Sequence, residues 1–279
     1  MSKAKTLLAT ALFGAALPAF AATVSYTYTF SPAIGETTTL GNKVVFAGSG
    51  SDGSAMNVTV SAWASSAASV TSNGYISTSN STSRNSLIEQ AYLESSGTAL
   101  RVDAQGEGET SPNHAMDNSG KLEAILFDFG QTGGVDNKVS LDQFMMSWTT
   151  NDSDFDVMAY TAGVSGYDVY TSLLANSFNS LKGSAGWSAV GNTYTNVGTS
   201  TVSVDDTVPV QSRYWLIGAD GIGGEFSDKY FDYGKIATIV TSFTKPGGTT
   251  GTGVPEPTSL ALIGGALAAM VFSRSRKAG

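Results

Sequence analysis

The chain has 279 residues, with 15 Lys and Arg against 23 Asp and Glu, one histidine and no cysteine. The lack of cysteine excludes disulfides, a thiolate nucleophile and cysteine-ligated metal sites, and a single histidine excludes an HExxH zinc site. The acidic balance repels phosphate backbones, so we expect no nucleic-acid partner.

The first 21 residues have the layout of a secretory signal peptide. Two lysines precede an apolar run at 7–17, and a proline separates this run from small residues. Ala19 and Ala21 occupy the two small positions of an A-x-A site. We therefore expect export through the Sec machinery and cleavage by signal peptidase after Ala21.

Residues 22–244 are predicted to form one all-β domain. The segment TVSYTYTF at 23–30 alternates apolar and polar residues, which is typical of a half-buried strand. Further short runs with strand character lie between turns rich in glycine, Asn and Asp, at 43–48, 56–63, 99–104, 122–130, 155–160, 200–206, 213–219 and 235–243. Only 172–181 favours a helix, a short one without good caps. Because strands and helices do not alternate, we predict a single β-sandwich of jelly-roll type.

Two segments are expected to pack poorly. The stretch 61–86 is rich in Ser and Thr and has few large apolar residues, so we expect a solvated excursion between strands, or else a glycosylated or ligand-facing loop. Residues 245–253 form a linker rich in Gly and Thr, which would separate the domain from the C-terminal tail.

Three aspartates spaced by two are the candidate metal ligands. Asp152, Asp154 and Asp156 would share one face of an extended segment, and calcium suits such a set of carboxylate oxygens. An EF-hand loop is excluded because Val157 stands where that loop needs glycine. The alternative, favoured by the regular alternation, is the solvent face of a strand whose Phe155 and Val157 point into the core.

Other candidates for chemistry are weaker. The segment 218–232 combines glycines with acidic residues and is best interpreted as a polar hairpin turn; its acidic residues are Asp220, Glu225, Asp228 and Asp232. His114 could orient a ligand together with Asp117 and Asn118, although a loop histidine beside a turn at 117–120 is the simpler interpretation.

No residue is assigned a catalytic or cofactor-binding role. A Ser-His-Asp triad lacks the supporting G-x-S-x-G elbow, and glycoside hydrolysis would need a facing carboxylate pair that a sequence does not establish. Aromatic side chains could stack on sugars where exposed, but most are expected in the core; the tryptophans are Trp63, Trp148, Trp187 and Trp215.

The C-terminal tail has three parts in order. Pro255, Glu256 and Pro257 precede an apolar run of 13 residues at 260–272, and a basic end follows. As a helix this run is about 20 Å long, shorter than a ~30 Å hydrocarbon core, so it would make a transient rather than a permanent membrane segment. The basic residues would stay on the cytoplasmic side; they are Arg274, Arg276 and Lys277. Processing at both ends would leave 10 Lys and Arg against 22 Asp and Glu, because five basic residues and one glutamate are removed.

These parts closely resemble the PEP-CTERM sorting signal that exosortases recognise in Gram-negative bacteria. The resemblance implies passage through the inner membrane, cleavage near the Pro-Glu-Pro motif and release to the cell surface or extracellular matrix. The body resembles an exosortase-dependent surface-protein family in SPNHAMDNSG at 111–120, DSDFDVMAY at 152–160 and RYWLIGA at 213–219. The segment FDYGKIATIV resembles the terminal strand expected there, except that Gly234 departs from it and could mark a bulge.

We therefore expect a non-enzymatic surface or matrix protein, associated with exopolysaccharide or biofilm. The alternatives are a secreted carbohydrate- or calcium-binding module and an extracellular polysaccharide hydrolase.

Overall fold

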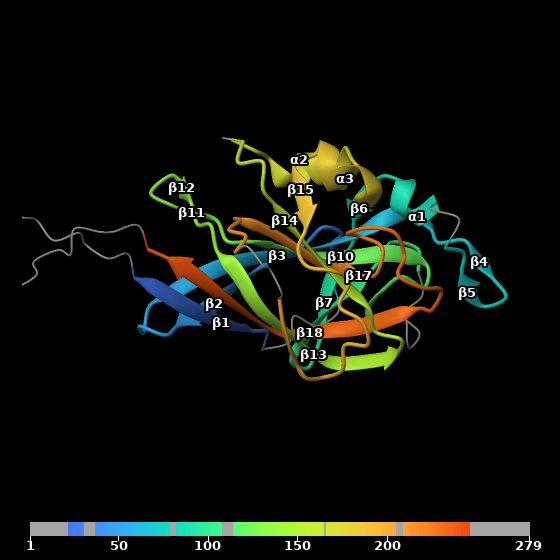
Figure 1. The fold of residues 1–279 in the computed structure, drawn as a ribbon, viewed down its shortest axis with the longest axis horizontal. Helices are drawn as coiled ribbons and strands as arrows, with labels where there is room; N and C mark the ends of the chain where they lie inside the picture. The colour runs from blue at the N-terminus through green and yellow to red at the C-terminus, as the bar shows by residue number, and fades with distance from the viewer. Residues whose placement is uncertain are drawn as a thin grey trace, which may run out of the picture. The chain divides into compact units, whose positions relative to one another are not determined.

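The computed structural model describes residues 22–30, 37–78, 82–107, 114–164, 166–204 and 209–245 (Figure 1). Within this span, Thr23–Thr244 form one compact unit. Ala19, Ala21 and the sorting motif lie outside the described residues, as does the apolar run at 260–272. None of the helices in the described ranges has the length and apolar character needed to cross a bilayer.

Most strands belong to one continuous sheet. Its main path runs in the order β15 (Trp187–Ala189), β14 (Phe155–Tyr160), β17 (Tyr214–Ala219), β10 (Lys121–Asp128), β3 (Ala55–Ala68), β2 (Lys43–Gly50), β1 (Thr23–Thr29), β18 (Asp232–Thr244), β13 (Ser140–Asn151) and β16 (Thr201–Ser203). Shorter strands pair at its side: β6 (Ile88–Gln90), β7 (Tyr92–Ser96), β8 (Ala99–Asp103) and β9 (Met116–Asp117). The paired strands run antiparallel, so the all-β prediction is confirmed.

Small elements decorate this sheet. Two hairpins are formed by β4 (Thr71–Ser72) with β5 (Tyr75–Ile76) and by β11 (Gln131–Thr132) with β12 (Val135–Asp136). Within the described residues, the helices are α1 (Thr82–Asn85), α2 (Val169–Leu174) and α3 (Phe178–Ser184).

The first strand shows how the sequence pattern becomes structure. Exposed and buried residues alternate strictly along β1, and Val24, Tyr26 and Tyr28 are buried. Its pairing with β18 brings Thr23 opposite Thr244. The first and last residues of the compact unit therefore lie side by side, and the strand that closes the domain pairs with the strand that opens it.

The two halves of the sheet enclose the main hydrophobic core. β3, β10, β14 and β17 contribute one wall, and β1, β13 and β18 contribute the other (Figure 1). The two sandwich faces are therefore joined in one continuous sheet. A second apolar cluster, which includes Leu173 of α2 and Phe178 of α3, covers the outer face of β10, β14 and β17. Those three strands are buried on both faces, which explains their nearly continuous apolar runs.

Three local expectations need correction. The single helix at 172–181 is in fact two short helices, α2 capped by Asp168 and α3 capped by Ser177. The stretch 61–86 is not a solvated loop, because it contains the second half of β3 with a buried Trp63, the β4–β5 hairpin and α1. No register shift falls at Gly234, which pairs with Thr149; the nearest shifts lie on either side of Met146, where first β18 and then β13 has the extra residue.

Gly234 has a packing role. A methyl group at this position would collide with the ring of Phe155, which is fully buried on the facing half of the sheet. The glycine thus lets β18 and β14 approach closely at the end of the core.

Candidate functional site

The strand pairing gathers aspartates from three parts of the chain. Asp152 and Asp154 lie between β13 and β14, Asp220 follows β17, and Asp232 opens β18. Asp232 forms an isolated bridge with Asp152, and the backbone N–H of Asp220 donates to the carbonyl of Asp154 at 3.0 Å. With Asp228 from the β17–β18 connection, these residues form a group that we name the Asp232 cluster.

Three members of the Asp232 cluster are close enough to share one ion. Asp152, Asp154 and Asp232 each present a carboxylate oxygen within 4.8 Å of the other two. Asp232 is held by the backbone N–H of Asp154 at 2.7 Å and by the side-chain amide of Asn118 at 2.6 Å. Asp154 in turn accepts from the backbone N–H of Asn196 at 2.7 Å and from the Ser227 hydroxyl at 2.8 Å. The oxygens are therefore positioned by the fold before any ligand arrives.

The electrostatics of the cluster oppose a fully ionised state. Burial, reinforced by Asp220 and Asp154, raises the pKa of Asp232 to about 9. Burial, together with Asp156 and Asp154, raises the pKa of Asp220 to about 7. The pKa of Asp228 is also raised, by partial burial and by its hydrogen bond and charge interaction with Asp152. Such a group needs either protons or a cation at neutral pH.

One buried carboxylate oxygen of the cluster has no hydrogen-bond partner among the described residues. Asp220 is 1% exposed, and its Oδ2 accepts from the backbone N–H of Ser227 at 2.6 Å, whereas its Oδ1 has no hydrogen-bond partner among the described residues. The hydroxyl of Ser227 also donates to Asp154, so the two carboxylates converge on this serine. A buried carboxylate oxygen without a partner is costly, and either a proton on Asp220 or a nearby cation would remove that cost.

Asp156 is not among the three aspartates whose oxygens converge. Its carboxylate accepts from the backbone N–H groups of Gly221 and Gly223, each at 2.9 Å, and from the Thr193 hydroxyl at 2.8 Å. Asp232 therefore takes the place of Asp156 among the candidate metal ligands. Calcium binding at these residues remains a prediction. The preferred expectation of a solvated strand face is wrong, because Asp154 and Asp156 are both buried.

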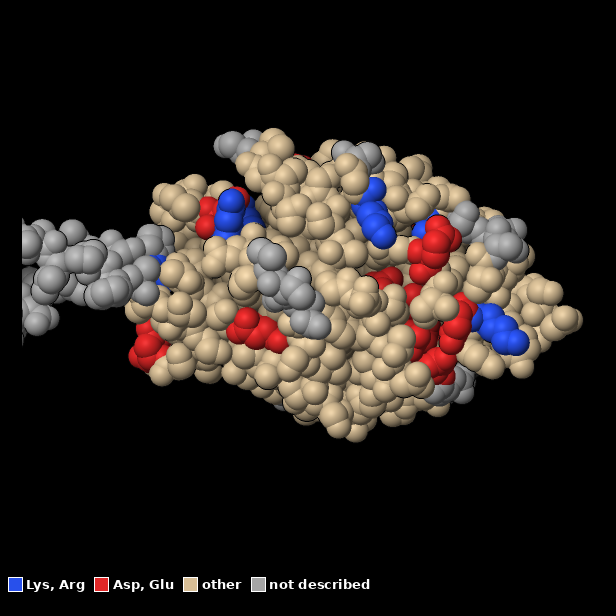
Figure 2. Space-filling model, viewed as in Figure 1, with Lys and Arg blue, Asp and Glu red and all other residues tan. Residues whose placement is uncertain are grey.

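The other acidic and histidine candidates have separate roles. Glu225 pairs with the buried Arg84 at 2.6 Å and leaves its own side chain exposed. His114 stacks against Trp148 with ring centroids 6.5 Å apart. Figure 2 shows acidic side chains gathered at the end of the molecule where the β4–β5 hairpin and the end of β13 lie, with few basic groups between them.

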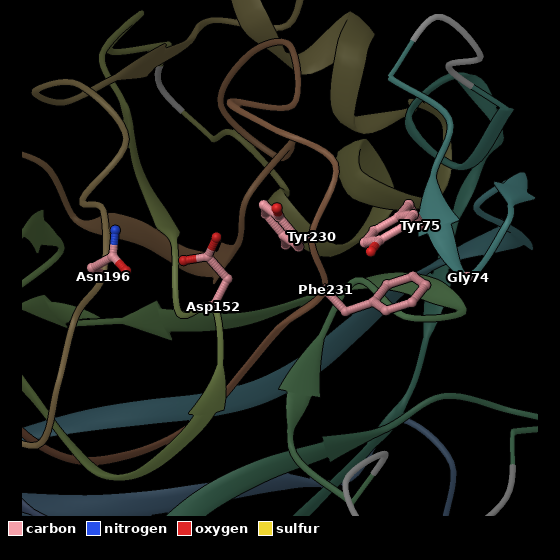
Figure 3. Close-up of a pocket in the computed structure, with 6 residues that line it drawn as sticks. All are labelled: Gly74, Tyr75, Asp152, Asn196, Tyr230 and Phe231. Carbon is pink, nitrogen blue, oxygen red and sulfur yellow. The ribbon is translucent and has the colours of Figure 1, made fainter.

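A pocket of about 500 Å³ adjoins the Asp232 cluster. It is lined by Gly74, Tyr75, Asp152, Asn196, Tyr230 and Phe231 (Figure 3). Tyr75 and Tyr230 are 40% and 46% exposed, and their rings meet edge to face with centroids 5.6 Å apart. Figure 3 shows Tyr230 between the carboxylate of Asp152 and the ring of Tyr75. The pocket therefore combines an aromatic wall with a carboxylate that also belongs to the cluster.

Two tight turns build this pocket. Asn73 and Gly74 have φ values of 54° and 80°, the conformation of a two-residue hairpin turn, and they place Tyr75 at the start of β5. Asn196 also adopts a positive φ of 51°, and in this conformation its backbone N–H reaches Asp154. The Asn-Gly pair was a sequence signal for the hairpin. No comparable signal links residues as distant as Tyr75, Asp152 and Tyr230.

Outside the described residues, comparison with protein families finds the PEP-CTERM protein-sorting motif at residues 253–277. The chain carries a PEP-CTERM motif. No curated protein and no solved structure matches the chain. The PEP-CTERM motif implies export through the membrane to the cell surface, with an exosortase as the processing partner.

The PEP-CTERM match includes the Pro-Glu-Pro tripeptide at 255–257 and the basic residues near the end of the chain. These residues belong to the motif that directs sorting of the protein. What the delivered domain does depends on its own surface, where the Asp232 cluster and the adjoining pocket are the best-formed candidates.

Proposed function

We propose that this exported, exosortase-sorted protein is a non-enzymatic surface or matrix protein whose β domain binds polysaccharide. The sugar would occupy the pocket between Tyr75, Tyr230 and Asp152, and a calcium ion would occupy the Asp232 cluster. The exopolysaccharide of the producing cell is the expected ligand, because the sorting motif delivers the domain to the surface on which that polymer lies.

The main support for the proposal is that Asp152 belongs both to the pocket and to the Asp232 cluster. It lines the aromatic pocket and also presents an oxygen to Asp154 and Asp232. Exposed tyrosine rings offer apolar faces to the C–H side of a sugar ring, and carboxylates or a bound cation satisfy its hydroxyl groups. A cation at this point would also let an acidic protein bind an acidic polymer, which its net charge otherwise repels.

The arrangement of the carboxylates favours binding over hydrolysis. A glycosidase needs an acid and a base on opposite sides of the scissile bond, about 5 Å apart or more. Here the three oxygens converge within 4.8 Å, and those of Asp154 and Asp232 already accept hydrogen bonds from the protein. Release of reducing sugar from the polymer by the purified protein would support the hydrolase alternative.

Cosedimentation with the producer's own exopolysaccharide tests the proposal. Residues 22–245 should bind the polymer in millimolar calcium and much less in chelator. Replacing Tyr75 and Tyr230 together by alanine should weaken binding about tenfold, which corresponds to about 1.4 kcal/mol. Replacing both by phenylalanine should preserve most of the binding, because the rings remain.

Leu174 provides the matched control. It is 46% exposed, like Tyr230, but it lies on α2 and does not line the pocket. Leu174→Ala should therefore bind like the unmodified protein. Equal binding by the double alanine variant, or equal binding with and without calcium, would contradict the proposal.

A further inference from the structure

A second pocket, of about 220 Å³, is lined by residues of β14, the end of α3, the segment after β15 and the β17–β18 connection. It shares no lining residue with the pocket of Tyr75 and Tyr230. Its volume is below the ~300–1,000 Å³ of pockets that hold drug-sized ligands, so it suits a smaller molecule. We name it the Lys182 pocket, and its polar side chains are those of Asp156, Lys182, Asn192, Thr193 and Glu225.

The two carboxylates of the Lys182 pocket already have partners in the protein. Asp156 Oδ1 accepts from the Thr193 hydroxyl at 2.8 Å, and its Oδ2 accepts from two glycine N–H groups of the β17–β18 connection, each at 2.9 Å. Both oxygens of Glu225 accept from the guanidinium of Arg84, at 2.6 and 3.2 Å. Neither acidic group therefore needs a ligand to satisfy it.

Lys182 differs from these acidic residues, because its ammonium group has no partner of opposite charge. Its side chain is exposed, and the ion pairs formed among the described residues do not include it. A methyl group placed on Gly224 would have Lys182 Nζ as its neighbour at 3.6 Å, and Gly224 itself lines the pocket. The charged end of the side chain thus lies beside the β17–β18 connection, at the pocket.

The backbone that carries Lys182 is held in place by a break in α3. Lys182 has non-helical angles of φ −66° and ψ 109°, and Gly183 follows with a positive φ of 91°, a conformation that favours glycine. Lys182 also forms an isolated bridge with Trp187, whose side chain is buried. The long side chain of Lys182 therefore extends from a fixed point beside the pocket.

We propose that the Lys182 pocket binds the carboxylate of a small hydroxylated ligand, which is the chemistry of a uronate sugar. An ammonium group donates up to three hydrogen bonds and forms its strongest ones with anionic oxygens. The side chains of Asn192 and Thr193 line the same pocket and offer hydrogen-bond partners to hydroxyl groups. A singly charged carboxylate fits better than a phosphate, because Asp156 and Glu225 would repel a dianion more strongly. This site goes beyond the proposed function and does not rest on it, because the two pockets share no lining residue.

An NMR titration of ¹⁵N-labelled residues 22–245 tests the proposal, with sodium glucuronate as the probe. Glucuronate should shift the backbone amide signals of Gly191, Asn192 and Gly224 and saturate in the millimolar range. Glucose, which lacks the carboxylate, and inorganic phosphate should each bind at least about tenfold more weakly. High salt should weaken the binding of glucuronate, because it screens the interaction between the charges.

Variants of two pocket residues separate the charge from the shape of the pocket. Lys182→Gln should weaken glucuronate binding about tenfold, and Lys182→Arg should retain most of it. Gly224→Leu keeps every charge but fills space beside the ammonium, so it should also weaken binding; a β-carbon at this position makes only an ordinary contact with Lys182. Lys138→Gln is the control, because Lys138 is an exposed lysine that does not line the Lys182 pocket, and it should leave the affinity unchanged.

Three results would overturn the proposal. They are equal binding of glucose and glucuronate, unchanged glucuronate affinity in Lys182→Gln, and shifts confined to the surroundings of Tyr75 and Tyr230. The last result would leave the proposed polysaccharide pocket standing. Loss of exopolysaccharide binding in calcium, with glucuronate still bound beside Lys182, would instead overturn the proposed function alone.

Discussion

Raising the pH should destabilise the β domain whenever calcium is chelated. The pKa of Asp220 is raised from 3.8 to about 7 and that of Asp232 to about 9, so the folded protein retains protons that the unfolded chain releases. A group with a raised folded-state pKa stabilises the fold fully below its unfolded pKa, and this stability is lost as the pH rises through its folded pKa. The loss should therefore extend from about pH 4 to about pH 9.

The size of the effect follows from Asp220 alone. A shift of about three pKa units corresponds to about 4 kcal/mol at 1.36 kcal/mol per unit. For a domain of this length, 1 kcal/mol changes the Tm by about 2–4 °C, so the Tm in chelator should fall by roughly 8–16 °C between pH 4 and pH 8. Calcium competes with protons for the same oxygens, so it should raise the Tm strongly at pH 8 and little at pH 5.

Differential scanning calorimetry across this pH range, in chelator and in calcium, is the assay. Asp220→Asn should remove much of the loss below pH 7. Asp168→Asn is the control, because Asp168 is an exposed N-cap where Asn serves equally well, and it should keep the unmodified pH profile. A Tm in chelator that stays constant from pH 5 to pH 8, or an equal calcium effect at both values, would show that these aspartates do not control the pH dependence of stability.

Three further outcomes are expected. In a urea titration, Gly234→Ala should lower the free energy of unfolding by about 1–3 kcal/mol, because its methyl group meets the buried ring of Phe155. Gly198→Ala is the control: Gly198 has open space around it, so this change should be neutral or slightly stabilising. Ser177→Ala should cost about 1 kcal/mol in that titration, because it removes the capping box of α3; no change would contradict the cap. Replacing residues 255–257 by alanine should make uncut protein accumulate in the inner membrane of a host that has an exosortase. Mass spectrometry that finds residues 260–279 retained on the unmodified protein at the cell surface would contradict this prediction.

The sequence predicted the strands well where one face is solvated or both faces are buried. The alternation of β1 and the apolar run of β17 each correspond to an observed burial pattern. It missed β13, because the register shifts between Leu141 and Trp148 break the alternation on which strand prediction depends. It also missed the cap at Ser177, which depends on the reciprocal hydrogen bonds with Ser180.

Only some residues of the candidate site could be predicted from the sequence. Asp152 and Asp154 were identified by local spacing, but spacing also selected Asp156, which the fold directs to the backbone of Gly221 and Gly223. Asp232 lies 78 residues from Asp154 along the chain and reaches it only through the pairing of distant strands. The alternation predicted a solvated acidic face, because a local pattern cannot reveal that another loop covers that face.

The most direct test of the proposed binding site is a crystal structure of the β domain grown in millimolar calcium with an oligosaccharide from the producer's exopolysaccharide. We expect a calcium ion about 2.3–2.6 Å from oxygens of Asp152, Asp154 and Asp232, with a sugar ring against Tyr75 and Tyr230. The same crystal with no ion among these aspartates, or with the sugar bound away from the two tyrosines, would contradict it.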